Sequence, residues 1–231
     1  MKERPILFSG PMVRAILFDI KTKTRREVKK LLGFGQITQF GQSDTKGFDW
    51  HFRDKQGRWH DISTEKLLKA NPYGQPGDRL WVRETFAEVG CIGKPIDWFE
   101  YHYKADYTDG IYTGYADMCF DRWKPSIHMP REASRIMLEM TDVRVERLRD
   151  ITDSDAISEG IESFRPVPGD GPPETRYRDY TAEEKFKHGK TVRKYQHYTP
   201  RPSFFSLWES INGKDSVISN PWVWVITFKR L

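Results

Sequence analysis

The sequence predicts a single domain of the α+β class, in which short strands outnumber helices. Residues 80–86 and 222–228 alternate apolar and polar side chains, as half-buried strands do, and we expect a further strand at 136–145. Residues 12–17 and 204–212 carry apolar side chains at helical spacing. With 231 residues, the chain is long enough to bury a substantial core within one elaborated domain, 1–231.

The N-terminal half is expected to contain a strand, a helix and a hairpin in that order. Residues 5–9 predict a short strand, and Pro11 begins the helix well because its fixed φ suits a first helical turn. Residues 47–59, rich in aromatic and charged side chains, are typical of a hairpin. The turn chemistry of residues 76–79 then introduces the strand at 80–86.

Two adjacent charged residues on that strand require an explanation. Successive side chains of a strand point to opposite faces, so either Arg83 or Glu84 points to the buried side. An unpaired charge in such a place is costly. The buried residue therefore has either a structural partner of opposite charge or a ligand, and the sequence leaves both interpretations open.

An acidic helix is expected within residues 151–161. Thr152 is a suitable N-cap with Asp155 three residues later, and Gly160 ends the helix. The acids of the first turn suit the positive end of the helix dipole and are interpreted as structural. Glu159 lies in the last turn, where the dipole disfavours an acid. Glu159 is therefore the better functional candidate.

Composition bounds the partners and excludes several site classes. A net charge of +5, from 38 basic and 33 acidic residues, permits an anionic partner without demanding one. Cys91 and Cys119 form no CxxC pair, no cluster has metal-ligand spacing, and the glycine-rich nucleotide and GxSxG fingerprints are absent. No apolar stretch reaches the roughly 20 residues of a membrane helix. We therefore expect a cytoplasmic protein without metal or cofactor.

The run Lys21-Thr22-Lys23-Thr24-Arg25-Arg26, directly after the first helix, mixes hydroxyls with cations. In an extended segment the lysines and Arg25 share one side, and Lys21 at the corner can turn back toward Thr24. A lysine beside a threonine hydroxyl is a candidate base and nucleophile pair, provided that burial or neighbouring cations lower the pKa of the amine. From these residues alone, a basic surface turn is the competing interpretation.

Six segments in this order resemble the ASCH family, a branch of the PUA-like superfamily, and in particular its long phage and prophage members. The matching segments span the chain with gaps: 5–12, 21–26, 76–84, 125–130, 141–161 and 220–228. The resemblance implies a small antiparallel β-barrel of PUA-like type with helices packed at its ends. It also implies long loop insertions near residues 33–75, 87–122 and 162–202. Independently of the resemblance, the proline, glycine and charged residues of 164–202 predict a surface loop.

Small bacterial members of this family hydrolyse the amide of N4-acetylcytidine with a lysine, a threonine and a glutamate. The resemblance places these roles on Lys21, Thr24 and Glu159. Asp19 departs from the family, which usually has glycine there; glycine suits a left-handed helix end better than aspartate does. The sequence thus predicts an amidohydrolase acting on an N4-acylated cytidine or a similar modified base.

Two other functions remain open at this stage. A non-catalytic module binding RNA or modified nucleic acid through the same pocket is the main alternative, and a ribonuclease is a weaker one. The expected partner is a modified nucleoside or single-stranded nucleic acid. The side chains expected to contact this substrate are Thr22, Arg26, Trp81, Arg83, Glu84, His128 and Arg131.

Overall fold

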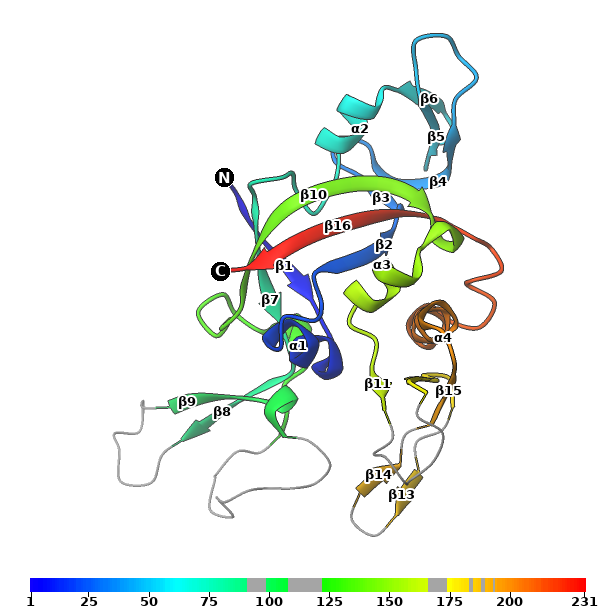
Figure 1. Ribbon diagram of the computed structural model, residues 1–231. Coiled ribbons are helices and arrows are strands. Elements are labelled where there is room, and N and C mark those ends of the chain that lie inside the picture. Colours follow the sequence, from blue (N-terminus) through cyan, green and yellow to red (C-terminus); the bar gives the residue numbers. More distant parts are fainter. Residues whose placement is uncertain (91–98, 108–121, 166–173, 183–184, 188–189, 193) are drawn as a thin grey trace.

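The computed structural model describes residues 1–90, 99–107, 122–165, 174–182, 185–187, 190–192 and 194–231 (Figure 1). The fold is α+β, with most strands gathered in several sheets and few helices, so the predicted class is confirmed. Among the described residues, no helix is both long and apolar enough to cross a membrane. Cys91 and Cys119 lie outside the described residues.

The main sheet has five strands in the order β1-β7-β10-β16-β2. The bounds of these strands are Glu3–Leu7 for β1, Arg79–Arg83 for β7, Met137–Arg147 for β10, Trp222–Arg230 for β16 and Lys23–Glu27 for β2. β1 and β7 are parallel, and all other pairs are antiparallel. Figure 1 shows β10 and β16 as long, strongly curved strands that run side by side.

The main sheet has its edges at β1 and β2. Among the described residues no backbone ladder joins these two strands. A side chain connects them instead: Arg26 Nη2 on β2 donates to the carbonyl of Leu7 on β1 at 2.7 Å. The described strands therefore form a curved, open sheet whose two edges approach each other.

The core covers both faces of β16, which lies between β10 and β2. Its consecutive residues Val223, Trp224, Val225 and Ile226 are all fully buried. Because neighbouring side chains point to opposite faces, four buried residues in a row require a cover on each side of the sheet. The strand expected at 222–228 is present. Its burial on both faces goes beyond the single buried face that alternation predicts.

Three helices lie below the curved strands in Figure 1. Their bounds are Gly10–Leu17 for α1, Asp153–Ser158 for α3 and Pro200–Asn212 for α4. The predicted cap of α3 is confirmed, since the Asp155 amide donates to Thr152 Oγ1 at 3.1 Å. Short 3-10 helices occur at Lys104–Asp106 (η1), Ser126–His128 (η2) and Leu148–Asp150 (η3).

A second sheet follows β2 in the chain and contains the predicted hairpin. Its order is β3-β4-β5-β6, with β3 at Lys30–Leu31, β4 at Gly35–Gln42, β5 at Trp50–Asp54 and β6 at Trp59–Ile62. Helix α2 (Thr64–Lys69) comes next. Trp50 of β5 packs edge-on against Trp222 at 5.0 Å between ring centroids. The segment 33–75 is thus an ordered addition fastened to β16.

The other two expected insertions are described in part. In the segment 87–122, β8 (Phe86–Gly90) pairs with β9 (Phe99–Tyr103), while residues 91–98 and 108–121 lie outside the described ranges. Within 162–202, strands replace the predicted loop: β11 (Ser163–Phe164), β12 (Arg176–Arg178) and β15 (Tyr195–His197) form one sheet, and β13 (Lys185–Lys187) pairs with β14 (Lys190–Val192).

The prediction of a surface loop at 164–202 is wrong for these strands, and α4 anchors the chain at the end of β12. Ser203 Oγ donates to the Arg178 carbonyl at 2.6 Å, and the Tyr180 amide donates to Ser206 Oγ at 3.0 Å. Such anchors come from residues more than 20 positions away, so the local proline and glycine content did not reveal them. The proline-rich residues 166–173 lie outside the described ranges.

Candidate active site

The corner between α1 and β2 positions the first functional side chain. After α1 the chain folds back, and the amides of Ile20 and Lys21 both donate to the Ala15 carbonyl, at 2.9 and 3.0 Å. Asp19 adopts the left-handed conformation, with φ of 56°, and its carboxylate pairs with Arg230 at 3.1 Å. An aspartate therefore takes a left-handed backbone geometry that glycine adopts more readily, and the corner turns Lys21 inward.

Lys21 is a buried ammonium with three hydrogen-bond acceptors. The residue is 3% exposed. Its Nζ donates to the Lys23 carbonyl at 2.7 Å, to the Glu159 carbonyl at 2.8 Å and to Glu159 Oε2 at 2.9 Å. Burial lowers the pKa of Lys21; Glu159 opposes this effect, while the nearby Arg26 and Arg25 reinforce it. Lys21 is thus a buried ammonium whose pKa lies below the ordinary value for a lysine.

Glu159 reaches Lys21 because α3 ends at that point. Glu159 is the C-cap residue of α3 and is 4% exposed. The next residue, Gly160, has φ of +80°, and a Cβ built on it would lie 2.7 Å from Ala15 Cβ and 2.9 Å from Lys21 Cβ. A glycine is therefore required both for the backbone turn and for the close packing of α3 on the Lys21 corner.

Arg25 links Glu159 to two further carboxylates. Its side chain has no exposed surface. Nη1 donates to Glu159 Oε1 at 3.1 Å, Nη2 to Asp155 Oδ2 at 2.7 Å, and Nε to Glu146 Oε1 at 3.0 Å. The network compensates the acid at the C-terminal end of α3, which the helix dipole disfavours.

Asp155, like Glu159, forms ion pairs with cations of the main sheet. Lys23 and Arg144 both pair with it, Arg144 at 2.8 Å. Burial alone would raise the pKa of Asp155, but hydrogen bonds from Lys23 and Arg25 lower it to about 2. From the sequence, Asp155 was expected only to stabilise the N-terminus of α3. Its distance of 130 residues from Arg25 explains why the second role was missed.

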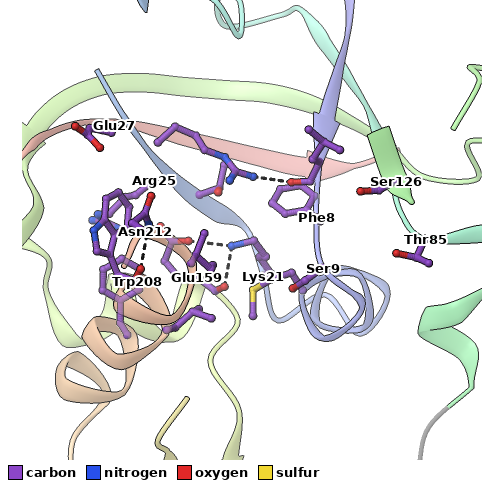
Figure 2. A pocket seen from close by; sticks show the side chains of 17 residues that line it. Phe8, Ser9, Lys21, Arg25, Glu27, Thr85, Ser126, Glu159, Trp208 and Asn212 are labelled. Carbon is purple, nitrogen blue, oxygen red and sulfur yellow. Dashed lines mark hydrogen bonds and ion pairs between the residues drawn. The ribbon is translucent and has the colours of Figure 1, made fainter. Parts of the chain in front are cut away.

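A pocket of about 460 Å³ lies beside this network. Figure 2 shows Lys21 between Glu159 and Phe8, with Arg25 and Trp208 on one side. β2 and α3 supply the charged wall, while α1, the end of β1 and α4 supply most of the apolar wall. The lining residues are Leu7, Phe8, Ser9, Met12, Lys21, Thr24, Arg25, Arg26, Glu27, Thr85, Ser126, Glu159, Phe204, Leu207, Trp208, Ile211 and Asn212.

The pocket therefore brings together Lys21, Thr24 and Glu159. Thr24 is 3% exposed and lies on β2, where its backbone pairs with Ile226. In the described part of the chain, however, no hydrogen bond joins Lys21 Nζ to the Thr24 hydroxyl. The contact that the spacing predicted is absent because Glu159 and the Lys23 carbonyl take the donors of the ammonium.

Of the seven predicted substrate contacts, Arg26 alone lines this pocket. Its guanidinium lies over the Phe8 ring, 5.4 Å from the centroid, in addition to its bond to the Leu7 carbonyl. The backbone of Thr22 instead connects α3 to β16: its amide donates to the Ser158 carbonyl and its carbonyl accepts from the Phe228 amide, both at 2.9 Å.

The remaining predicted contacts lie outside the lining for separate reasons. Glu84 is buried and accepts hydrogen bonds from Arg135 on both carboxylate oxygens. The buried charge on this strand therefore has a structural partner of opposite charge. Trp81 lies under Arg83 and Arg131, with 4.7 and 5.9 Å from ring centroid to guanidinium carbon. His128 is exposed, and Ser126 of the same turn lines the pocket in its place.

Helix α4 is the part of the site that the sequence analysis did not identify. The helical spacing of its apolar residues predicted a helix, but no role in the pocket. Phe204, Leu207, Trp208 and Ile211 instead also line the pocket, and Asn212 adds a side-chain amide. Nothing in the helical periodicity separates a residue that lines a cavity from one that fills a core.

The arrangement combines the groups required for acyl transfer. Thr24 offers a hydroxyl, Lys21 an amine whose pKa is lowered by burial, and Glu159 a carboxylate that holds the amine. No group of three or more histidine, cysteine or acidic side chains with metal-binding geometry occurs among the described residues.

Comparisons of the chain with protein-family models, with curated proteins and with solved structures found no match. The resemblance to the ASCH family therefore stays a prediction. What is known of the site comes from its own geometry: three candidate catalytic side chains, one buried arginine network and an apolar wall from α4.

Proposed function

We propose that this protein is an amidohydrolase that removes the acyl group from an N-acylated nucleobase, with N4-acylated cytidine as the representative substrate. The observation that carries the proposal is the meeting of Lys21, Thr24 and Glu159 in one pocket. The residues come from β2 and from the end of α3, with 138 positions between Lys21 and Glu159. A basic surface turn does not account for a lysine that is 3% exposed.

The proposed reaction has two steps. Thr24 Oγ bonds to the acyl carbon while neutral Lys21 accepts the hydroxyl proton, the amide C–N bond breaks, and the proton passes to the leaving exocyclic nitrogen. Water then attacks the threonine ester; its proton passes through Lys21 to Thr24 Oγ, and a carboxylic acid leaves. Glu159 holds Lys21 in reach. For this, the Lys21 amine exchanges its bond to the Lys23 carbonyl for one to Thr24.

The remainder of the pocket suits a nucleobase with an acyl group. A volume of about 460 Å³ lies within the roughly 300–1,000 Å³ typical of small-molecule sites. Ser126 and Thr85 place hydroxyls at the lining, and neither hydroxyl makes a hydrogen bond to another described residue. Phe8 supplies an aromatic ring, and the apolar side chains of α4 suit the hydrocarbon part of an acyl group.

The same proposal includes the fold. A PUA-like domain of the ASCH type is consistent with a curved five-stranded sheet whose edges, β1 and β2, approach each other at the pocket. The long segments 33–75, 87–122 and 162–202 then elaborate that domain, as in the phage and prophage members that the sequence resembles.

Release of cytidine from N4-acetylcytidine tests the activity. We expect turnover by the native protein, and its loss in Thr24→Val, which removes the hydroxyl at nearly constant shape. Thr24→Ser, which keeps a hydroxyl, is the matched control and should retain part of the rate. Lys21→Met should lower the rate by about 10²–10⁴-fold, the usual contribution of a general base. Full activity of Thr24→Val would exclude the mechanism.

A binding module is the second candidate, and one observation favours it. The three N–H donors of the Lys21 ammonium are all engaged, and none reaches Thr24. A pocket in this state presents a hydroxyl and an aromatic ring without a free base. Absence of turnover on a panel of N4-acylated cytosines, nucleosides and short RNAs, with retained binding of one of them, would favour this candidate.

A further inference from the structure

The Glu159 carboxylate is divided between two cations. Lys21 Nζ binds Oε2 at 2.9 Å, and Arg25 Nη1 binds Oε1 at 3.1 Å. Each cation therefore holds one oxygen. A lysine with a carboxylate to itself would receive the full stabilisation of its charge, whereas Lys21 shares its counterion with an arginine that stays charged.

Arg25 is itself fixed from the opposite side. Nε and Nη2 bind Glu146 Oε1 at 3.0 and 2.5 Å, and Nη2 also binds Asp155 Oδ2 at 2.7 Å. Arg144 ties these two acids together, since it pairs with both Asp155 and Glu146. The Arg25 side chain has no exposed surface, so these ion pairs hold its guanidinium beside Glu159 without competition from bulk water.

The charges of this cluster balance when Lys21 is neutral. Four cations, Lys21, Lys23, Arg25 and Arg144, face three carboxylates, Glu146, Asp155 and Glu159. Asp142 approaches Arg144 only from the exposed side, at 3.7 Å. Arginines do not lose their proton in proteins. Of the two lysines, Lys21 has a side chain 2% exposed, against 24% for Lys23, so burial acts mainly on Lys21.

In the part of the chain that the structure describes, Glu159 is the acid that pairs with Lys21. From β2 come the cations Arg25 and Arg26, both of which disfavour a charge on Lys21. The Phe8 ring lies 5.4 Å from Nζ, and α1 contributes only the Ala15 carbonyl, which binds the Lys21 amide. Glu27 is the other acid of the pocket lining, and α4 contributes no charged residue to that lining.

We propose that Arg25 is a positioning residue for Lys21: by holding one oxygen of Glu159 it restricts Lys21 to the other, and thereby makes Lys21 the group of the cluster that releases a proton. The proposal rests on the proposed role of Lys21 as the base that activates Thr24. In that reaction Arg25 touches neither the acyl group nor the transferred proton. It acts only through Glu159.

Titration of Lys21 by NMR on lysine-labelled protein tests the proposal without any substrate. The Lys21 resonance is assigned by its loss in Lys21→Met. In the native protein we expect its titration midpoint to lie below that of the exposed lysines. In Arg25→Gln the whole Glu159 carboxylate becomes available to Lys21 and a cation is lost, so the midpoint should rise by roughly one pH unit or more. Arg25→Met, which also removes the cation and fills the buried site with an apolar side chain, serves if the first variant does not fold.

Glu146→Gln is the matched control, because Glu146 holds the same guanidinium but touches neither Glu159 nor Lys21. It should loosen the network to a similar extent, yet leave the Lys21 midpoint unchanged or lower it. A midpoint equal to that of exposed lysines in the native protein, or no rise in the Arg25 variants, would overturn the proposal. Missing amide hydrolysis with the expected shifts would instead overturn the proposed function and leave the coupling of Arg25 to Lys21 in place.

Discussion

Lys21 Nζ and Glu159 Oε2 lie 2.9 Å apart although 138 residues separate them in the chain. The contact joins the corner after α1 to the end of α3 and closes one wall of the pocket. Both side chains are almost fully buried, at 2% and 5% exposure. Breaking a buried pair by removing one partner usually costs several kcal/mol, so this contact fixes the site as well as the fold.

Packing of α3 on the Lys21 corner predicts a specific penalty for Gly160→Ala. Loss of the glycine costs about 1 kcal/mol for the left-handed backbone alone. Overlap of the new Cβ with Ala15 and Lys21, at 2.7 and 2.9 Å, should add about 1–3 kcal/mol. The control is Gly77→Ala, where φ is +86° but no atom lies within 4 Å. Urea unfolding of both variants measures the difference, and equal losses would contradict the crowding at Gly160.

Asp155 should make the protein sensitive to acid. Its pKa falls from 3.8 to about 2 on folding, so its contribution to stability is complete above pH 4 and is lost as the pH falls through about 2. The shift corresponds to a contribution of about 2 kcal/mol. Asp155→Asn should remove it, flattening the fall in the free energy of unfolding between pH 4 and pH 2. Parallel curves for the variant and the native protein would show that other acids govern this range.

Asp19 gives a prediction about the left-handed turn after α1. Asp19→Gly relieves the backbone strain but loses an ion pair with Arg230 whose members are 68% and 37% exposed. Such exposed pairs contribute about 0–1 kcal/mol, so the net change in the free energy of unfolding should stay within about 1 kcal/mol. Asp19→Ala loses the pair and keeps the strain, and should be the less stable variant. Thermal or urea unfolding compares them; the reverse order would contradict this account of the corner.

If the protein binds single-stranded nucleic acid, the salt dependence should be shallow. Arg26 lines the pocket, and Arg83 and Arg131 are the two other arginines predicted from the sequence to contact the substrate, although they lie outside the pocket lining. A log-log slope of about 0.7 per contacted phosphate gives about 2 for three contacts. Arg83 pairs with no acid among the described residues, whereas Arg131 pairs with Glu3 at 3.0 Å. Arg83→Gln should therefore reduce the slope more than Arg131→Gln does.

Titration of labelled single-stranded and duplex oligonucleotides across a salt series measures these slopes. A steep slope with equal affinity for duplex and single strand would mean that surface charge, and not the pocket, binds the nucleic acid. No binding to either would favour a small-molecule substrate.

Local sequence signals predicted the elements around the site with good accuracy. Pro11 stands in the first turn of α1, Thr152 caps α3, and a turn at 76–79 precedes β7. Each of these signals depends on residues within a few positions of one another, where backbone preference and capping act directly. The strands within 162–202 were missed because their anchors, Ser203 and Ser206, belong to α4.

Within the site, too, local signals were readable from the sequence and long-range contacts were not. By itself the sequence determined the corner that carries Lys21 and Thr24, because both residues belong to one short run, 21–26, that directly follows the first helix. It also marked Glu159 as an acid that the helix dipole does not favour. Only the tertiary structure decided that Arg25 and Lys21 bind different oxygens of the Glu159 carboxylate. It also decided that Asp155 joins this network and that α4 completes the pocket. Those contacts depend on the packing of β2 against α3 and α4. The ion pairs join residues 130 and 134 positions apart, and no local periodicity encodes such separations.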